Sequence, residues 1–359
     1  MIKFSDSIRT LNPDLYLESK ADEFWNILNP RKGDNELSVH SIQSRLQKLL
    51  EEYKNRENSV LEDTQQNQRE LKYLEYLSEN NSEKLESIIK SKPNELVNFI
   101  DEAYEILEES DLFTINNGIL KSTEFGDILI NRVFNYTTFR SSAKCIHFYK
   151  SLQLEGKQCF YCNDSELEII SKEIPTDENK HCNSDGKLLF DLDHFYLKSK
   201  YPFLALSFFN LIPCCGTCNS RFRSTKDFII STHINPYLHS FDQHYVFEFD
   251  DAEIATSLNS SKSDLETIKL NIKRTSDRPQ DKTAQDLELE NRYRHKKKHI
   301  NDILDTIIYY QDRGLDEIME HLCGINEQHI PRCRSKILDV SKSKLSLDFL
   351  ALTIPLLED

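Results

Sequence analysis

Two pairs of cysteines carry the strongest chemical signal in this sequence of 359 residues. Within each pair, two residues separate the cysteines, a spacing that lets both thiolates face one ion. Two such pairs provide four sulfur ligands, the set that holds zinc in a tetrahedron. Because four protein ligands leave no open position for a substrate, the predicted zinc is structural. The ligands of this predicted site are Cys159, Cys162, Cys215 and Cys218.

Other residues nearby offer alternative ligands. Cys214 directly precedes Cys215, but a ligand set with Cys214 would place three residues before Cys218, which is a less regular spacing. His181 and Cys182 lie between the two cysteine pairs and would compete for the ion. We expect both to be bystanders.

A second group of residues has the chemistry of phosphodiester hydrolysis. His194 can take a proton from an attacking water, because the pKa of histidine lies near neutral pH. Charge that grows on the phosphoryl oxygens and the leaving group calls for a hard cation with oxygen ligands. Asp193 offers a carboxylate beside the histidine, and Asn219 offers an amide oxygen in the first turn of an expected helix. Asn210 can bond to the backbone and order the loop and the histidine ring. We therefore predict a catalytic Mg²⁺ or Mn²⁺ held by Asp193 and Asn219.

The charge around this group favours a polyanionic substrate. The whole chain has a formal charge of −15, yet no acidic residue occurs from Phe195 through Lys226. A local basic groove can hold phosphates, while acidic residues on remote faces deter nonspecific binding. We therefore predict that DNA is bound by the basic residues of this stretch, which are Lys198, Lys200, Arg221, Arg223 and Lys226.

Composition predicts a mainly helical α+β chain around this site. Only 8 glycines occur, well below the average usage of about 7%, which favours long helices over tight hairpins. We expect helical regions over residues 1–140 and 251–359, flanking a metal-site module at 141–250. No apolar run approaches the roughly 20 residues that span a bilayer, and the start lacks the apolar core of a signal peptide. We therefore expect a cytoplasmic protein with no membrane contact, whose cysteines are thiols or metal ligands.

Hydrophobic spacing locates several elements more closely. The predicted elements are helices over 38–53 and 93–107, strands over 188–196 and 245–249, and an amphipathic helix over 300–308. The basic run 292–299 comes just before that last helix and is either a solvated face or a contact with the DNA backbone.

Taken together, these residues resemble the HNH, or ββα-metal, nuclease family. The matching pattern is Cys159-x-x-Cys162, Asp193-His194 and Asn210-Leu-Ile-x-x-Cys215-x-x-Cys218-Asn219. The resemblance implies two strands and a helix around a catalytic metal. It further implies that His194 is the general base, that Asp193 binds Mg²⁺ and that Asn210 orders the loop. Asn219 would complete the metal site, as in the HNN variant of the family.

A narrower resemblance covers residues from about 140 to 250. This part looks like the HNH subunits of bacterial antiphage systems, the Septu type above all, in which the nuclease works with an ABC-like ATPase; related pairs occur with some retrons. The resemblance implies a defence role and a hetero-complex with an ABC/AAA-like ATPase. The segments that carry it are His194-Phe-Tyr-Leu-Lys-Ser-Lys-Tyr-Pro, Ile234-Asn-Pro-Tyr and Gln243-His-Tyr-Val-Phe.

A protein of another class fits part of the same pattern. A zinc-stabilised DNA-binding or scaffold subunit without catalysis explains the cysteine pairs and the basic segment equally well. It does not explain why Asp193, His194 and Asn219 occur together at these places.

Overall fold

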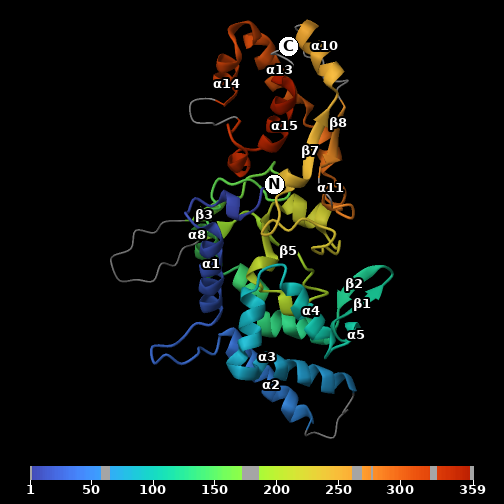
Figure 1. The fold of residues 1–359 in the computed structure, drawn as a ribbon. Coiled ribbons are helices and arrows are strands. Elements are labelled where there is room, and N and C mark those ends of the chain that lie inside the picture. Colours follow the sequence, from blue (N-terminus) through green and yellow to red (C-terminus); the bar gives the residue numbers. More distant parts are fainter. Residues whose placement is uncertain are drawn as a thin grey trace.

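The computed structural model describes residues 2–57, 65–171, 186–260, 269–275, 278–323 and 330–355. Its described part is mostly helical, with four separate two-stranded antiparallel sheets, so the α+β prediction is confirmed at this level. Figure 1 shows an elongated molecule with the first helices at one end, the last helices at the other, and β5 between them.

Two long helices and one helical segment that is broken at residues 79–82 build the N-terminal region. The first, α1 (Pro13–Leu28), begins where the Asn12 side chain accepts a hydrogen bond from the Leu15 N–H at 3.1 Å. A proline suits that first helical position, because its missing N–H would have no partner there. Both α1 and α2 (Ile42–Glu57) pack against α3 (Gln65–Lys90).

The predicted N-terminal helices occur with small shifts. The stripe predicted over 38–53 becomes the buried face of α2, formed by Ile42, Leu46, Leu49, Leu50 and Tyr53. Val39 precedes the helix and is 68% exposed, so it does not belong to that face. In the next helix, α4 (Leu96–Tyr104), Leu96 and Ile100 are buried as expected. Pro93 lies in the turn before α4 and not in its first turn.

A β-hairpin that the sequence analysis did not predict follows α4. It consists of β1 (Phe113–Asn116) and β2 (Ile119–Ser122), and it projects from the side of the molecule in Figure 1. Asn117 and Gly118 form its turn with φ angles of 52° and 76°. Two central residues with positive φ are what a tight type I′ hairpin turn requires, and Asn-Gly is its preferred sequence. The surrounding helices are α5 (Glu109–Leu112), α6 (Glu124–Ile128), η2 (Leu129–Phe134), α7 (Tyr136–Arg140) and α8 (Ala143–Ser151).

The centre of the molecule is a short hairpin followed by one helical segment. Strand β5 (Asp191–His194) pairs with β6 (Leu211–Cys214), with Asp193 opposite Ile212. The chain then enters the π-helical segment η5 (Thr217–Arg223), which packs on β5. The unit thus has two strands followed by one helical segment, and the nuclease fold implied by the resemblance stays a prediction.

The strand predicted over 188–196 is divided between two sheets. Its first residue closes β4 (Gly186–Leu188), which pairs with β3 (Ile169–Ser171). Its later residues form β5, and the loop from β5 to β6 holds the 3₁₀ turns η3 (Pro202–Leu204) and η4 (Phe208–Asn210).

The C-terminal end combines helices with a fourth sheet. Strand β7 (Tyr245–Phe249) agrees with the strand predicted there, but it pairs with β8 (Leu270–Arg274), in a region predicted to be helical. The two strands therefore join the predicted regions 141–250 and 251–359. The remaining elements are α9 (Phe241–His244), α10 (Asp251–Ser260), α11 (Thr283–Asp286), α12 (Leu289–Arg294), α13 (Lys297–Tyr310), η6 (Gln311–Arg313), α14 (Leu315–Cys323), η7 (Arg334–Asp339) and α15 (Ser343–Thr353).

One continuous cluster of buried apolar residues extends through all three predicted regions. At one junction, the Phe4 ring of the short 3₁₀ helix region η1 (Ser5–Ser7) stacks on Phe160 and Tyr237, with centroids 4.7 and 4.8 Å away. The regions are thus packed on a shared core. None of the described helices is long and apolar enough to cross a membrane.

Candidate functional site

Four buried cysteines meet where β6 leads into η5. Their sulfur atoms all lie within 4.8 Å of one another, and they belong to Cys159, Cys162, Cys215 and Cys218. Sulfurs bound at about 2.3 Å to a tetrahedral zinc would be roughly 3.8 Å apart, and the Sγ atoms of Cys162 and Cys215 are 3.8 Å apart. The donors therefore have the number, type and spacing that a structural zinc ion requires.

The alternative ligands can now be placed. Cys214 is fully buried but is not part of the cysteine group, so the more regular spacing with Cys215 is the one that the fold uses. His181 and Cys182 lie outside the described residues.

Hydrogen-bond donors and a positive charge around the cysteines favour the thiolate form of their side chains. The Cys215 N–H donates to Cys159 Sγ at 3.3 Å, and the Cys218 N–H donates to Cys215 Sγ at 3.4 Å. Arg292 Nη1 lies 3.3 Å from Cys218 Sγ. Zinc with four thiolates carries two net negative charges, which this guanidinium partly balances.

The C-terminal region thus supplies the surroundings of the zinc ligands. Besides Arg292, the hydroxyl of Tyr293 on α12 donates to the backbone oxygen of Cys162. Three more side chains of the basic run 292–299 have partners within the protein, with Arg294 next to Glu290, Lys296 next to Asp164 and His299 next to Ser346. Sequence analysis offered a solvated face or a DNA contact for this run, and it missed the contact with the cysteines.

His194, at the end of β5, is held in one tautomer. Its Nε2 lies 3.0 Å from the backbone oxygen of Ala205. Because a carbonyl oxygen only accepts, Nε2 carries the proton and Nδ1 keeps a lone pair. Burial, assisted by Lys198, lowers the pKa of His194 to about 3, so the ring is neutral at neutral pH. The ring also meets Tyr136 edge-on, at 4.5 Å between centroids.

Asn210 orders the loop that supplies this histidine contact. Its Oδ1 accepts from the Tyr196 N–H at 2.7 Å, and its Nδ2 donates to the Tyr196 and Leu204 carbonyls at 3.1 Å each. Leu204 directly precedes Ala205, whose carbonyl holds His194. The fully buried amide therefore fixes the position of the histidine ring through the loop, which is the role the sequence analysis gave it.

The oxygen-bearing side chains of the site are two carboxylates of β5 and one amide of η5. Asp193 is buried, and its Oδ2 accepts from the Tyr161 hydroxyl at 2.7 Å and lies 3.4 Å from Arg223 Nε. Burial raises the pKa of the Asp193 carboxyl, and the charge of Arg223 opposes this rise. Asn219 contacts a different carboxylate, since its Nδ2 donates to Asp191 Oδ2 at 3.0 Å.

Asp191 was missed by the sequence analysis. Residues two apart in a strand share a face, so Asp191 and Asp193 both face η5 while His194 points to the other side. The Asp-x-Asp spacing before the histidine was the signal that could have found it. Half-buried Asp191 is also more open to solvent than Asp193, and its carboxylate lies near Gly216, where a Cβ would be 3.5 Å away.

Arg223 corrects one of the predicted DNA contacts. Its side chain is fully buried, and Nη2 donates to the backbone oxygens of His194 and Phe195 at 3.1 and 2.9 Å. Its guanidinium lies over the Phe228 ring, 4.2 Å from the centroid. A side chain in this position cannot reach a phosphate on the surface, so the prediction for Arg223 is wrong.

The other four predicted DNA contacts differ in their surroundings. Arg221 is exposed, and Lys198 lies over the Tyr136 ring at 4.6 Å. Lys200 pairs with Asp227 at 2.7 Å, and Lys226 donates to the backbone oxygen of Asp286. The stretch without acidic residues thus receives acidic neighbours from outside it.

No protein-family model matches the chain, and neither does any curated protein or any solved structure. The chemistry of the site therefore rests on the residues and distances above.

Carboxylate and amide oxygens near η5 are ligand types of a hard divalent cation, and a catalytic Mg²⁺ or Mn²⁺ at this place stays a prediction. Two carboxylates, Asp191 and Asp193, and the amide of Asn219 lie along one side of the β5–η5 contact. Mg²⁺ and Mn²⁺ prefer such oxygen ligands and usually keep several waters. Asp191 and Asn219 are the more accessible pair, because Asp193 is covered by Tyr161 and Arg223.

Proposed function

We propose that this chain is a metal-dependent HNH-type endonuclease that hydrolyses phosphodiester bonds of DNA. The observation that carries the proposal is the tautomer of His194, whose Nδ1 keeps a lone pair because Nε2 donates to the Ala205 carbonyl. This histidine ends a strand whose opposite face brings carboxylates to Asn219, next to the four cysteines. A zinc site alone would need none of these polar groups.

His194 and the two carboxylates extend from opposite faces of β5, so a phosphate shared by both would lie at the end of the strand, where His194 is. The attacking and leaving oxygens lie on opposite sides of the phosphorus in an in-line displacement. His194 would accept the proton of the attacking water, while Asn219, Asp193 and Asp191 would hold Mg²⁺ or Mn²⁺. Once bound, the cation supplies positive charge for the leaving oxygen. The backbone contacts of Arg223 keep the strand and η5 together during this step.

A cleavage assay with one histidine variant tests the proposal. We expect wild-type protein to cut plasmid DNA with Mg²⁺ or Mn²⁺ and to stop when EDTA is added. His194→Ala should lower the rate by about 10²–10⁴-fold, the usual contribution of a general base. His40→Ala, a change at an exposed histidine in the N-terminal region, is the matched control and should cut as fast as wild type.

Circular dichroism must show that His194→Ala keeps its fold. Cleavage by this variant at the wild-type rate would show that His194 is not the base. Absence of cleavage by pure wild-type protein with either metal, in the presence of normal DNA binding, would favour the second candidate.

That second candidate is a zinc-stabilised DNA-binding or scaffold subunit without catalysis. The burial of Asp193 beneath Tyr161 and Arg223 favours it, because a covered carboxylate binds metal less readily. It predicts that DNA affinity does not depend on added Mg²⁺ or Mn²⁺ and is unchanged by His194→Ala.

We also propose that the nuclease acts within an antiphage complex with an ABC-like ATPase. The support is the resemblance of residues 140–250, together with one apolar surface suited to a partner. The β1–β2 hairpin exposes Ile115 and Ile119, at 65% and 56% of their full surface. Co-purification of the chain with an ATPase encoded beside it tests the proposal. A monomer with full, unregulated cleavage would contradict it.

A further inference from the structure

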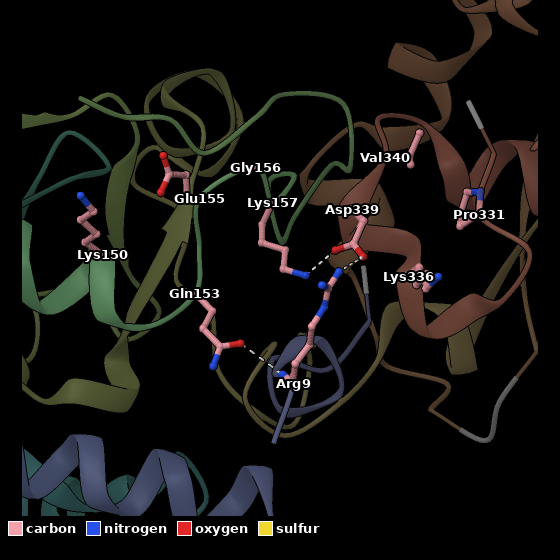
Figure 2. A pocket seen from close by; sticks show the side chains of 10 residues that line it. All are labelled: Arg9, Lys150, Gln153, Glu155, Gly156, Lys157, Pro331, Lys336, Asp339 and Val340. Atoms are coloured by element: carbon pink, nitrogen blue, oxygen red, sulfur yellow. Dashed lines mark hydrogen bonds and ion pairs between the residues drawn. The ribbon is translucent and has the colours of Figure 1, made fainter. Parts of the chain in front are cut away.

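A cavity lined in part by the segment just before Cys159 has an unusual charge. Its volume is about 640 Å³, and it lies where three segments meet: Arg9 near the N-terminus, residues 150–157 at and after the end of α8, and residues 331–340 around η7. Figure 2 shows Arg9, Lys157 and Asp339 at its centre, with Lys150 and Lys336 toward opposite ends.

Cations outnumber carboxylates in the lining of this cavity. The basic lining residues are Arg9, Lys150, Lys157 and Lys336, and the acidic ones are Glu155 and Asp339. The whole chain has 45 basic and 60 acidic residues, so the ratio is reversed here. An excess of positive charge in a concave site raises the local concentration of anions.

The central contacts contain a carboxylate shared by two cations. Asp339 Oδ1 binds the Lys157 amine, and its Oδ2 lies 3.4 Å from Arg9 Nη2. The Lys157 side chain is only 10% exposed, whereas that of Arg9 is 78% exposed. An exposed ion pair at this distance contributes little to stability, so Arg9 can exchange Asp339 for another anion at small cost.

The size and remaining lining indicate the kind of anion. Cavities of about 300–1,000 Å³ hold organic molecules of cofactor size. Arginine and lysine are the side chains that bind phosphate groups. Pro331 and Val340 add apolar surface beside the cations. We propose that this cavity binds a small phosphorylated molecule of nucleotide size, with its phosphates held by Arg9, Lys157 and Lys336.

Occupancy of the cavity would act on the zinc site through the backbone. Lys157 lies two residues before the zinc ligand Cys159, and the Gln158 N–H between them donates to the Leu338 carbonyl at 2.7 Å. A ligand that bridges Lys157 and Lys336 therefore joins the cysteine segment to η7 more firmly. It should raise the melting temperature of the full chain.

Calorimetric titration of the full chain with ATP and with inorganic tripolyphosphate tests the proposal. We expect at least one of the two to bind and to raise the melting temperature. The double variant Arg9→Ala/Lys336→Ala should lower affinity by at least about tenfold, because it removes two charged contacts. Stronger binding of ATP would identify a nucleoside phosphate as the ligand, and equal binding would identify the phosphate chain alone; both outcomes support an anion site.

Two further variants test whether removal of negative charge from the cavity strengthens the binding of an anion. Asp339→Asn removes the internal anion while keeping its shape, so it should strengthen binding of either probe. Lys121→Ala, at an exposed lysine on β2, is the control and should bind as wild type does. The proposal is wrong if neither probe binds at about millimolar concentration, if Asp339→Asn weakens binding in a folded protein, or if the Lys121 control loses as much affinity as the double variant.

Discussion

At the scale of single residues, Arg223 joins three parts of the candidate site. It reaches from η5 to the backbone of His194 and Phe195, it lies beside Asp193, and it packs on Phe228. Since Asp193 and Arg223 are both buried, each offsets the cost of burying the charge of the other. The same side chain thereby sets the distance between the strand that carries the histidine and the segment that carries Asn219.

Loss of the Arg223 charge should therefore unfold the site rather than merely weaken DNA binding. We expect Arg223→Met to lower the free energy of unfolding by about 3–5 kcal/mol, because it leaves a buried carboxylate unpaired. Urea denaturation followed by circular dichroism measures this. Arg221→Met, at an exposed position, is the matched control and should stay within about 0.5 kcal/mol of wild type. Equal stability of the two variants would contradict the conclusion that Arg223 holds β5 and η5 together.

Asp191 gives a second prediction at this scale, which depends on the proposed metal site. We expect Asp191→Ala to weaken Mn²⁺ binding by at least about tenfold, because the carboxylate next to Asn219 is lost. Electron paramagnetic resonance of Mn²⁺ added to the protein measures binding without requiring cleavage. Asp312→Ala, at an exposed acidic residue of the C-terminal region, should bind Mn²⁺ as wild type does. Unchanged binding in Asp191→Ala would leave Asp193 and Asn219 as the ligands.

At the scale of elements, the cysteine group connects the turn at 159–162 to the junction of β6 and η5. The connecting hairpin is short, with four residues in each strand, and such a unit has little stability of its own in water. Zinc binding is worth about 10–16 kcal/mol in zinc-finger peptides, so it can supply most of the order here. The helical segment with Asn219 would depend on the same ion.

Removal of zinc should therefore disorder β5, β6 and η5 together. We expect Cys218→Ser to lower zinc content from one ion per chain and to expose this region to trypsin. A colorimetric zinc assay and the cleavage pattern measure both effects. Cys333→Ser, at an exposed cysteine outside the group, should change neither. A Cys218→Ser protein with normal trypsin resistance would show that the ion is dispensable for the fold.

The sequence predicts those elements and ligands that are defined by residues close to one another in the chain. The cysteine pairs, Asn210 and the stripe of α2 are all defined by spacing within a short stretch, and the structure has them where spacing put them. The β1–β2 hairpin was overlooked because low overall glycine content was weighed above one local Asn-Gly pair. That pair is itself a strong turn signal.

Contacts between distant segments could not be derived in this way. Arg292 is 74 residues from Cys218, and nothing near it in sequence indicates a sulfur partner. Arg223 is buried because Phe228 and the end of β5 enclose it, which depends on the tertiary packing of η5. A basic residue that bonds to the backbone inside the protein cannot be told from one that binds DNA by its residue type. The sequence analysis therefore gave all five basic residues of the stretch 195–226 the same role.

At the scale of the whole molecule, the regions flanking the site are part of its support. Asn163, next to the zinc ligand Cys162, donates to the Ile337 carbonyl at 2.7 Å and accepts from the Lys344 N–H at 3.1 Å. Together with the contacts of Arg292 and Tyr293, these bonds attach the C-terminal region directly to the cysteine turn.

A chain that ends at residue 275 should for this reason fail to hold its zinc. We expect it to be less soluble and to bind clearly less zinc than the full chain, because the cysteine turn loses its polar partners and its cover. Adding residues 276–359 as a separate chain during expression should restore both properties. A truncated protein with full zinc content and normal melting would show that the module is independent.

The same attachment has a consequence for synthesis in the cell. Arg292, Tyr293 and the partners of Asn163 are synthesised well after the cysteines. A nascent chain therefore cannot complete the contacts around its cysteine centre until residues near 344 have left the ribosome. If the centre cuts DNA, this order delays a damaging activity until those later residues are available to complete it.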